Sequence, residues 1–393
     1  MNERTMRGEV AVVGIGETTY YKRGQSPDAE FKLGIEAILK ACDDAGLDPR
    51  DIDGFASYSN DRNDPPRLAA ALNLKELRFS NMQWGGGGGG GSGAVGNAAA
   101  AVATGYADCV VVFRALAQGQ FGRFGQGPRI PTVQGRMAYT APYGLLSPAQ
   151  SFAMRVNRLF HDTPVGPETL KAVSLASYHH AQQNPRAVMY GRPLSSEDYD
   201  NSRWIVEPFH LFDCCQENDG AAALILMSAD RAKDFKQVPA YILGVATGVP
   251  VRAAAGVHNA VDYATSNFKS VAPHMYEMAK MSPSDVQVAQ IYENFTGGVV
   301  MSIIEHGLCT YENANEVLTF DNLVAPGGKL PLNTSGGNLA ECYMHGLELQ
   351  VEAVRQIRGQ STNQVPDIDV SLVASGPMVE PVSDVLFGSE ATL

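Results

Sequence analysis

Seven consecutive glycines at residues 85–91 directly precede a predicted helix at residues 93–106. A glycine in a helix interior is about 1 kcal/mol less favourable than an alanine, so we expect the run to lie before the helix. The first N–H groups of a helix lack intrahelical partners, and glycines leave them accessible. The run, which includes Gly88 and Gly89, is therefore a candidate for binding an oxyanion and for leaving space for a bulky substrate. The alternatives are a spacer between two elements or packing at a subunit interface.

The thiols and imidazoles show no spacing that is typical of metal ligands. The six cysteines are Cys42, Cys109, Cys214, Cys215, Cys309 and Cys342. Because the N-terminal segment lacks the apolar stretch of a signal peptide, we expect reduced thiols in a cytoplasmic protein. No run approaches the roughly 18 apolar residues of a membrane span. The sequence therefore predicts no metal site and no membrane span.

The charge of the chain restricts its partners. A net charge of -12 argues against a protein that binds nucleic acids or anionic membranes, because both need a cationic surface. A phosphate-bearing ligand needs only a local cluster of arginines or backbone N–H groups. The candidates for such a cluster, in a glycine-rich stretch, are Arg123, Arg129 and Arg136. They are equally suited to salt bridges or to a partner surface.

The elements that would position these groups alternate in type along the chain. Short apolar runs predict strands at residues 9–14, 54–58, 109–116, 221–228, 240–245, 286–292, 369–374 and 384–387. Longer amphipathic or alanine-rich segments predict helices at residues 28–45, 93–106, 167–182, 266–280, 297–306 and 339–357. This alternation, with several strands apolar on both faces, is typical of an α/β protein whose sheet is covered by helices on both sides.

One short pattern occurs twice. Residues 45–52 read Ala-Gly-Leu-Asp-Pro-Arg-Asp-Ile, and residues 279–286 read Ala-Lys-Met-Ser-Pro-Ser-Asp-Val. In both copies a predicted helix ends, a Pro-x-Asp turn follows and a strand begins, which favours a duplicated unit. Between the copies, residues 118–147 are rich in glycine, proline and aromatic residues and are typical of a functional loop insertion.

Four motifs in the right order make the chain resemble the thiolase superfamily, in particular its lipid-transfer-protein branch. They are Ser-Gly-Ala at 92–94 with Ala-Asp-Cys at 107–109, the segment 212–224 around Cys-Cys-Gln-Glu-Asn-Asp-Gly, Tyr-Glu-Asn-Phe at 292–295, and Asn-Thr-Ser-Gly-Gly at 333–337. The resemblance implies an α/β thiolase fold, with two duplicated βαβαβαββ halves in a five-layered αβαβα core, and a homodimer. The implied N-terminal half covers residues 1–250, with a loop domain at about 117–210, and the C-terminal half covers residues 251–393.

The catalytic positions of that superfamily carry other residues here. The place of the nucleophilic cysteine falls on Gly88, which has no side chain to acylate, so acyl transfer through a covalent thioester is excluded. The two histidine places carry Tyr292 and Tyr343. The C-terminal Cys-x-Gly motif reads Ala-Ser-Gly and ends at Gly376. This pattern resembles the thiolase-like aldolases of steroid side-chain degradation, in which paired tyrosines are catalytic.

The resemblance implies a carbon–carbon lyase that performs a retro-aldol cleavage. Such enzymes cleave a 17-hydroxy steroid with a short acyl-CoA side chain into a 17-ketosteroid and propionyl-CoA. They work with a partner that carries an OB-fold and a zinc ribbon, often attached to an enoyl-CoA hydratase. Coenzyme A is then part of the substrate, and no tightly bound cofactor is expected.

Retro-aldol chemistry requires a group that takes the hydroxyl proton, a stabiliser for the thioester enolate and a proton for its α-carbon. We expect Tyr343 to take the hydroxyl proton and Tyr292 to serve the enolate, with neighbouring donors or charges lowering a tyrosine pKa from about 10. Asn294 either orients substrate or caps the following helix. His345, two residues beyond Tyr343, is a further candidate for substrate contact, although it aligns with a non-catalytic position.

Two other functions are compatible with the same motifs. One is a non-catalytic thiolase-like scaffold or lipid-binding protein that supports a partner enzyme. Proton-transfer side chains at two separate catalytic positions favour the enzyme, because drift more often leaves small or apolar residues there. The other is an active thiolase that uses a different cysteine, which is disfavoured because neither Cys342 nor Cys214 occupies the nucleophile position.

Overall fold

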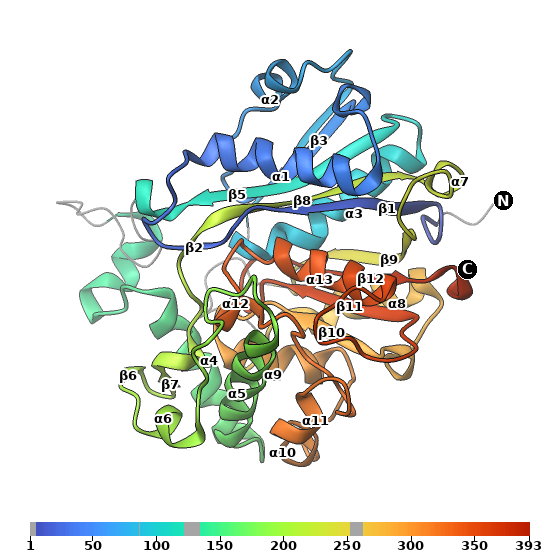
Figure 1. Ribbon diagram of the computed structural model, residues 1–393. Helices are drawn as coiled ribbons and strands as arrows, with labels where there is room; N and C mark the ends of the chain where they lie inside the picture. The colour runs from blue at the N-terminus through green and yellow to red at the C-terminus, as the bar shows by residue number, and fades with distance from the viewer. Residues whose placement is uncertain (1–4, 86, 122–133, 252–261) are drawn as a thin grey trace.

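A mixed ten-stranded sheet forms the centre of the computed structural model, which describes residues 5–85, 87–121, 134–251 and 262–393 (Figure 1). The strands follow the order β10-β11-β12-β9-β1-β8-β5-β3-β4, and the short β2 pairs with β8. Their bounds are β1 Val10–Glu17, β2 Tyr21–Lys22, β3 Gly54–Tyr58, β4 Phe79–Gln83, β5 Cys109–Ala117, β8 Asn218–Ser228, β9 Ala240–Gly248, β10 Val288–Ile291, β11 Val370–Ser375 and β12 Val382–Gly388.

The helices cover the outer faces of this sheet and fill the space between its two parts. Their bounds are α1 Glu30–Ala45, α2 Pro65–Leu72, α3 Gly91–Ala103, α4 Pro148–Asp162, α5 Glu168–Gln183, α6 Ser196–Asp200, α7 Ala229–Ala232, α8 Ala272–Ala279, α9 Thr296–Glu305, α10 Ala314–Val317, α11 Phe320–Leu323, α12 Gly337–Ala340 and α13 Leu347–Arg358. Helices α3 and α13 contact strands of both the β1–β8–β5–β3 part and the β9–β12–β11–β10 part of the sheet. Helix α1 covers the outer face of the first part, and α8 covers β9 and β12 of the second. The predicted five-layered α/β arrangement is confirmed.

The recurring pattern has the same structure in both places. Helix α1 ends at Gly46 and α8 at Lys280, each in the left-handed region, and a 3-10 turn, Pro49–Asp51 or Pro283–Asp285, leads to the next strand. Each helix also packs closely on the strand before it in the sheet. A Cβ on Gly14 of β1 would lie 2.3 Å from a carbonyl oxygen of α1, and the same distance holds for Gly244 of β9 and α8. The repeated sequence therefore encodes a repeated packing unit, while the boundary near residue 250 stays a prediction.

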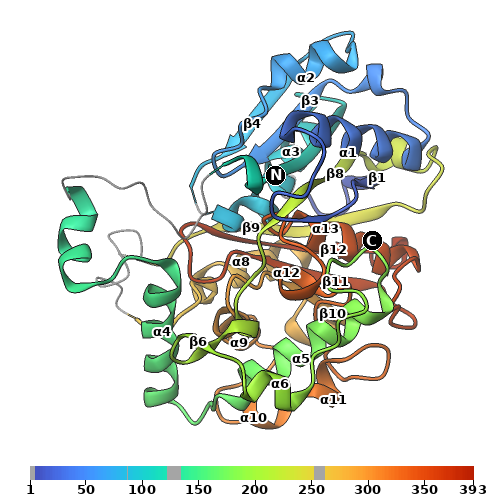
Figure 2. The same cartoon turned by 60° about the vertical axis from the view of Figure 1, so that its left-hand side comes forward.

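The segment between β5 and β8 carries several elements that the sequence did not predict. Helix α4 and the small β6–β7 hairpin, Trp204–Val206 and Phe209–His210, lie with α5 and α6 beside the second part of the sheet (Figure 2). Helix α4 begins with a capping box in which Ser147 and Gln150 bond each other's backbone N–H groups. Among the described residues, no helix is long and apolar enough to cross a bilayer.

Two helix predictions near the site are wrong in an informative way. The predicted helix at 339–357 is broken into α12 and α13, because His345 and Gly346 have φ values of 53° and 83°, which end helical geometry. The glycine run does not lie wholly before its helix, since Gly91 is the first residue of α3 and residues 87–90 form a 3-10 turn. The 3-10 turn at residues 87–90 and the break between α12 and α13 both lie next to Tyr292.

Candidate active site

Two buried tyrosines form the centre of the site. Tyr292 directly follows β10, and its N–H donates to the carbonyl of Ala374 on β11 at 2.9 Å. Tyr343 lies in the break between α12 and α13, and its N–H donates to Oδ1 of Asn218 at 2.8 Å. The Tyr292 hydroxyl donates to the Tyr343 hydroxyl at 2.6 Å, and the side chains are only 2% and 8% exposed. A proton can therefore pass directly between the two phenolic oxygens.

Both phenols are neutral at physiological pH. Burial raises the pKa of each hydroxyl well above its usual value of about 10, and for Tyr292 the neighbouring phenol adds to the increase. A net lowering of a tyrosine pKa below about 10 is therefore not found, because burial outweighs the neighbouring groups. For Tyr343 the hydrogen bond from Tyr292 and the charge of Arg114 only partly oppose the effect of burial on its pKa.

Gly88 lies directly against the Tyr292 ring. A Cβ at position 88 would be 2.2 Å from Cε2 and Cζ of Tyr292 and 2.5 Å from its hydroxyl oxygen. On another side of the ring, a Cβ on Gly346 would be 2.7 Å from Cδ2. The aromatic ring thus occupies the space that any side chain at position 88 would need.

The rest of the glycine run meets the end of β11. A Cβ on Gly376, whose φ is 69°, would lie 2.2 Å from the Cα atom of Gly89. Next to this contact, the N–H of Ser92 donates to Oγ of Ser375 at 3.1 Å. The N–H of Ser92 is therefore occupied, and an oxyanion would be bound by the earlier glycines of the run. Gly88, Gly89 and Gly376 come together as one backbone surface beside the tyrosines.

The imidazole of His345 packs edge-on against the ring of Tyr343. The two ring centroids are 5.1 Å apart with the planes at 90°. Nδ1 of His345 is 3.0 Å from Nη2 of Arg114, a buried arginine on β5 that the sequence did not single out. Burial and the nearby arginine charges keep the pKa of His345 well below its usual value of about 6.5, so the ring is neutral.

Asn294 is held by backbone groups at both ends of its amide. Its Nδ2 donates to the carbonyl of Pro377 at 2.9 Å, and its Oδ1 accepts from the N–H of Phe295 at 2.8 Å. The preceding Glu293 is buried, with a pKa raised to about 7 by burial, and accepts from Ser177 at 2.5 Å. These contacts favour support of the loop after β10 over direct orientation of substrate.

The thiols near the tyrosines are not activated. All six cysteines are unpaired, as the sequence predicts. Burial raises the pKa of the Cys342 thiol well above its usual value, and burial also raises the pKa of Cys214 to about 12. A thiolate is the nucleophilic form of cysteine, so these residues lack the property that a thiolase nucleophile requires.

Near the site, a cluster of buried carboxyl groups makes the stability of the folded protein depend on pH. Burial and the neighbouring Glu17 raise the pKa of Glu341 to about 8, whereas Glu17 is stabilised as an anion by Arg355 and Arg186. Asn184 Nδ2 donates to one oxygen of Glu341 at 2.8 Å. Because an unfolded glutamate has a pKa of about 4.3, folding favours the protonated form. The resulting stabilisation is complete below about pH 4 and is lost as pH rises through 8.

We expect Glu341→Gln to remove this loss. A glutamine keeps the acceptor for Asn184 and cannot ionise, so the variant should melt about 2 °C or more above the wild type at pH 9, and close to it at pH 5. Thermal unfolding at several pH values, followed by circular dichroism, measures the difference. Exposed Glu277→Gln serves as the control. A parallel pH dependence in wild type and Glu341→Gln would contradict the assignment.

The arginines that the sequence offers for binding phosphate groups are not among the described side chains. Arg123 and Arg129 lie outside them, as does the side chain of Arg136. Among the described residues, no group of three or more histidine, cysteine, aspartate or glutamate side chains is arranged to hold a metal ion.

The chain is similar throughout its length to two curated enzymes. It is 38% identical over 401 residues to the 17-hydroxy-3-oxo-4-pregnene-20-carboxyl-CoA lyase of Mycobacterium tuberculosis, which covers 98% of this chain and 100% of the relative. It is 38% identical over 395 residues to the steroid side-chain-cleaving aldolase of Thermomonospora curvata, which covers 98% of each chain. A family model described as thiolase C-terminal domain-like matches residues 252–385.

Solved structures show the same relationship. The Ltp2-ChsH2(DUF35) aldolase superposes with a TM-score of 0.91 at 36% identity, covering 99% of this chain and 100% of that chain. Human mitochondrial 3-ketoacyl-CoA thiolase superposes with a TM-score of 0.70 at 14% identity, covering 98% and 100% of the two chains. The second likeness shows the fold alone.

Proposed function

Because this chain belongs to the thiolase-like aldolases that cleave steroid side chains, we propose that it catalyses retro-aldol cleavage of a β-hydroxyacyl-CoA on a steroid. The proposed substrate is a 17-hydroxy steroid with a short acyl-CoA side chain, and the products are a 17-ketosteroid and propionyl-CoA. Coenzyme A enters as part of this substrate. The observation that carries the mechanism is the 2.6 Å contact between the Tyr292 and Tyr343 hydroxyls.

The tyrosine pair moves one proton in a relay. As the bond between the α- and β-carbons breaks, its electrons pass to the α-carbon and the thioester, and the β-hydroxyl becomes the ketone. The hydroxyl proton passes to Tyr343, the proton of Tyr343 passes to Tyr292, and the proton of Tyr292 reaches the α-carbon. Hydroxyl hydrogens rotate to suit their partners, so the pair can reverse the direction of its hydrogen bond when substrate binds.

This relay agrees with the ionisation of the site. Because the pKa of each phenol is raised, neither needs to exist as a stable phenolate before the reaction. Each tyrosine gives a proton as it receives one and ends in its starting form. Backbone N–H groups of Gly88 and Gly89 are the proposed donors to the enolate oxygen, since Gly88 lies against the Tyr292 ring and both residues belong to the 3-10 turn that precedes α3.

Incubation with a 17-hydroxy steroid acyl-CoA in deuterium oxide tests the proposal. Mass spectrometry should detect the 17-ketosteroid and a shortened acyl-CoA, with one deuterium on the α-carbon of the latter. The reaction is run with and without an OB-fold and zinc-ribbon protein. Binding of the acyl-CoA without products in either arrangement would instead favour a non-catalytic scaffold.

We propose two kinds of protein partner. The Ltp2-ChsH2(DUF35) aldolase is named for two components, which supports a partner for this chain, proposed to carry an OB-fold and a zinc ribbon and in some cases an attached enoyl-CoA hydratase. A second copy of this chain is the other proposed partner. Its support is the edge of the sheet formed by β4 (Figure 2). Met82 on this strand and Trp84 just after it are 48% and 86% exposed.

A further inference from the structure

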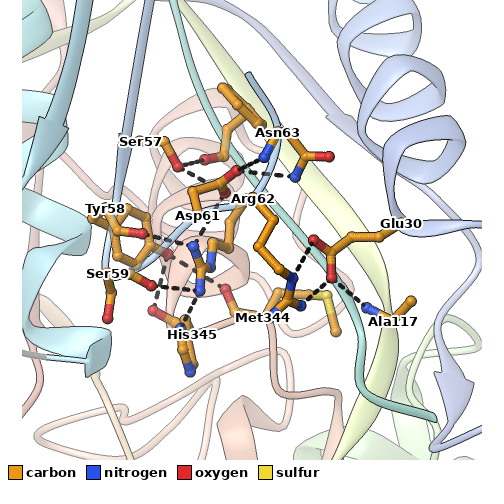
Figure 3. A network of polar contacts seen from close by, with 12 residues as sticks. Glu30, Ser57, Tyr58, Ser59, Asp61, Arg62, Asn63, Ala117, Met344 and His345 are labelled. Carbon is orange, nitrogen blue, oxygen red and sulfur yellow. Dashed lines mark hydrogen bonds and ion pairs between the residues drawn. The ribbon is translucent and has the colours of Figure 1, made fainter. Parts of the chain in front are cut away.

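Arg114, a buried arginine on β5, contacts the end of β3 and the loop that carries Tyr343. Its partners Tyr58, Ser59, Asp61 and His345 are labelled in Figure 3. Arg114 is 2% exposed, and its Nη1 donates to the carbonyl of Tyr58 at 2.6 Å while its Nη2 donates to the carbonyl of Ser59 at 2.9 Å. The carboxylate of Asp61, 3.1 Å from Nη1, balances its charge. Asp61 is itself fixed by the hydroxyl of Ser57 at 2.9 Å. The guanidinium is therefore held in one orientation by groups outside the tyrosine pair.

The orientation of Arg114 determines where His345 carries its proton. A guanidinium group has only donors, so Nδ1 of His345, 3.0 Å from Nη2, must accept with its lone pair. A neutral imidazole then has its single hydrogen on Nε2. A charged imidazole would place a second donor against the arginine, which the geometry disfavours. Arg114 thus selects one tautomer of the ring.

The backbone of His345 is fixed as well. Its φ is 53°, and its carbonyl accepts from the hydroxyl of Tyr58 at 3.0 Å. The Tyr58 ring lies 5.3 Å from the guanidinium carbon of Arg114, and its own carbonyl binds that group. His345 is therefore held at its backbone carbonyl and at Nδ1. Its ring is perpendicular to the Tyr343 ring, with the two centroids 5.1 Å apart.

We propose that Arg114 is a positioning residue that holds His345 as the Nε2–H tautomer, so that this histidine donates a hydrogen bond to the substrate oxygen that Tyr343 deprotonates. The inference rests on the proposed function for the identity of that oxygen. A neutral donor there strengthens its bond as the oxygen loses its proton and gains negative charge. It does so without adding a competing acid to the relay.

The tautomer is measured directly, without turnover. In protein labelled with ¹⁵N-histidine, long-range ¹H–¹⁵N spectra distinguish a protonated Nε2 from a protonated Nδ1, and His345→Phe identifies the signal among the eight histidines. We expect the Nε2–H form in the wild type and in Arg114→Lys, which keeps a donor, and a mixture of forms in Arg114→Gln. An Nδ1–H form in the wild type would overturn the proposal.

Kinetics then test the consequence. We expect Arg114→Gln to lower kcat for the steroid acyl-CoA about tenfold or more with KM changed less than about threefold, and His345→Phe to lower kcat about 100-fold. His345→Gln, which retains an amide donor, should recover part of that loss. Arg358→Gln, a buried arginine at the other end of α13 that bonds Asp44, controls for a general loss of stability.

The outcomes separate this inference from the proposed function. A loss of kcat in Arg114→Gln with an unchanged tautomer, or full activity in His345→Phe, would overturn the role of the arginine. Wild-type protein that shows the Nε2–H tautomer but cleaves no acyl-CoA with any partner would overturn the proposed function, and with it the substrate oxygen assigned to His345, while the fixed tautomer stands.

Discussion

Removal of either phenolic hydroxyl at the site is expected to stop most of the turnover without unfolding the protein. Tyr292→Phe and Tyr343→Phe each delete one oxygen of the 2.6 Å contact and keep the aromatic ring in place. Because general acid–base groups contribute about 100- to 10,000-fold to a rate, we expect kcat for steroid acyl-CoA cleavage to fall by that factor in each variant. Rapid-quench mass spectrometry of the ketone product measures it.

The double variant makes this prediction sharper. Groups that act as a single unit give losses that do not multiply, because the first substitution already interrupts the relay. Tyr292→Phe combined with Tyr343→Phe should therefore be no slower than the slower single variant, within about threefold. Tyr178→Phe, a buried tyrosine on α5, and Cys342→Ala control for packing and for thiol chemistry. If the losses in kcat multiply, the two tyrosines have independent roles. A double variant with the kcat of the wild type would refute the relay.

The positions of the two tyrosines follow from motif spacing, whereas their contact does not. Spacing within Tyr-Glu-Asn-Phe and after Asn-Thr-Ser-Gly-Gly places Tyr292 and Tyr343 on the two histidine positions of the superfamily. Residues 51 positions apart in sequence meet only because the chain breaks between α12 and α13. The broken segment has good helical periodicity, and the reversal at His345, a residue without the freedom of glycine, has no local signal.

The sequence context of Arg114 carries a signal that such a residue has polar partners. The arginine stands within Val-Val-Val-Phe-Arg-Ala-Leu-Ala, a strand whose other residues are apolar and fully buried. A charge inside such a run must have partners, because an isolated buried charge is too costly, so a lone arginine in a central strand indicates a polar network. Which residues form that network depends on β3 and on the loop at 341–346, and neither is close in sequence.

The glycine at the nucleophile position is most directly tested by substitution of Gly88. A methyl group at this position would overlap Tyr292, with 2.2 Å to its Cε2 and Cζ atoms, so Gly88→Ala must displace the ring and separate the two hydroxyls. We expect kcat to fall at least about 100-fold, comparable to the loss of one acid–base group, and stability to fall by about 1–3 kcal/mol from overpacking. Steady-state kinetics and thermal unfolding measure the two effects separately.

Gly88→Cys distinguishes crowding from missing chemistry. It restores the superfamily's nucleophile in type, yet the thiol would enter space that the Tyr292 ring already fills, and the histidine positions that would activate it carry tyrosines. We therefore expect neither acyl transfer nor aldol cleavage from this variant. The adjacent Gly87→Ala, whose Cβ meets nothing within 4 Å, should lose about 1 kcal/mol through its φ of 47° and keep most of its turnover. Wild-type kcat in Gly88→Ala would mean that Tyr292 can move without consequence, and the tyrosine pair could then not be the route of the proton.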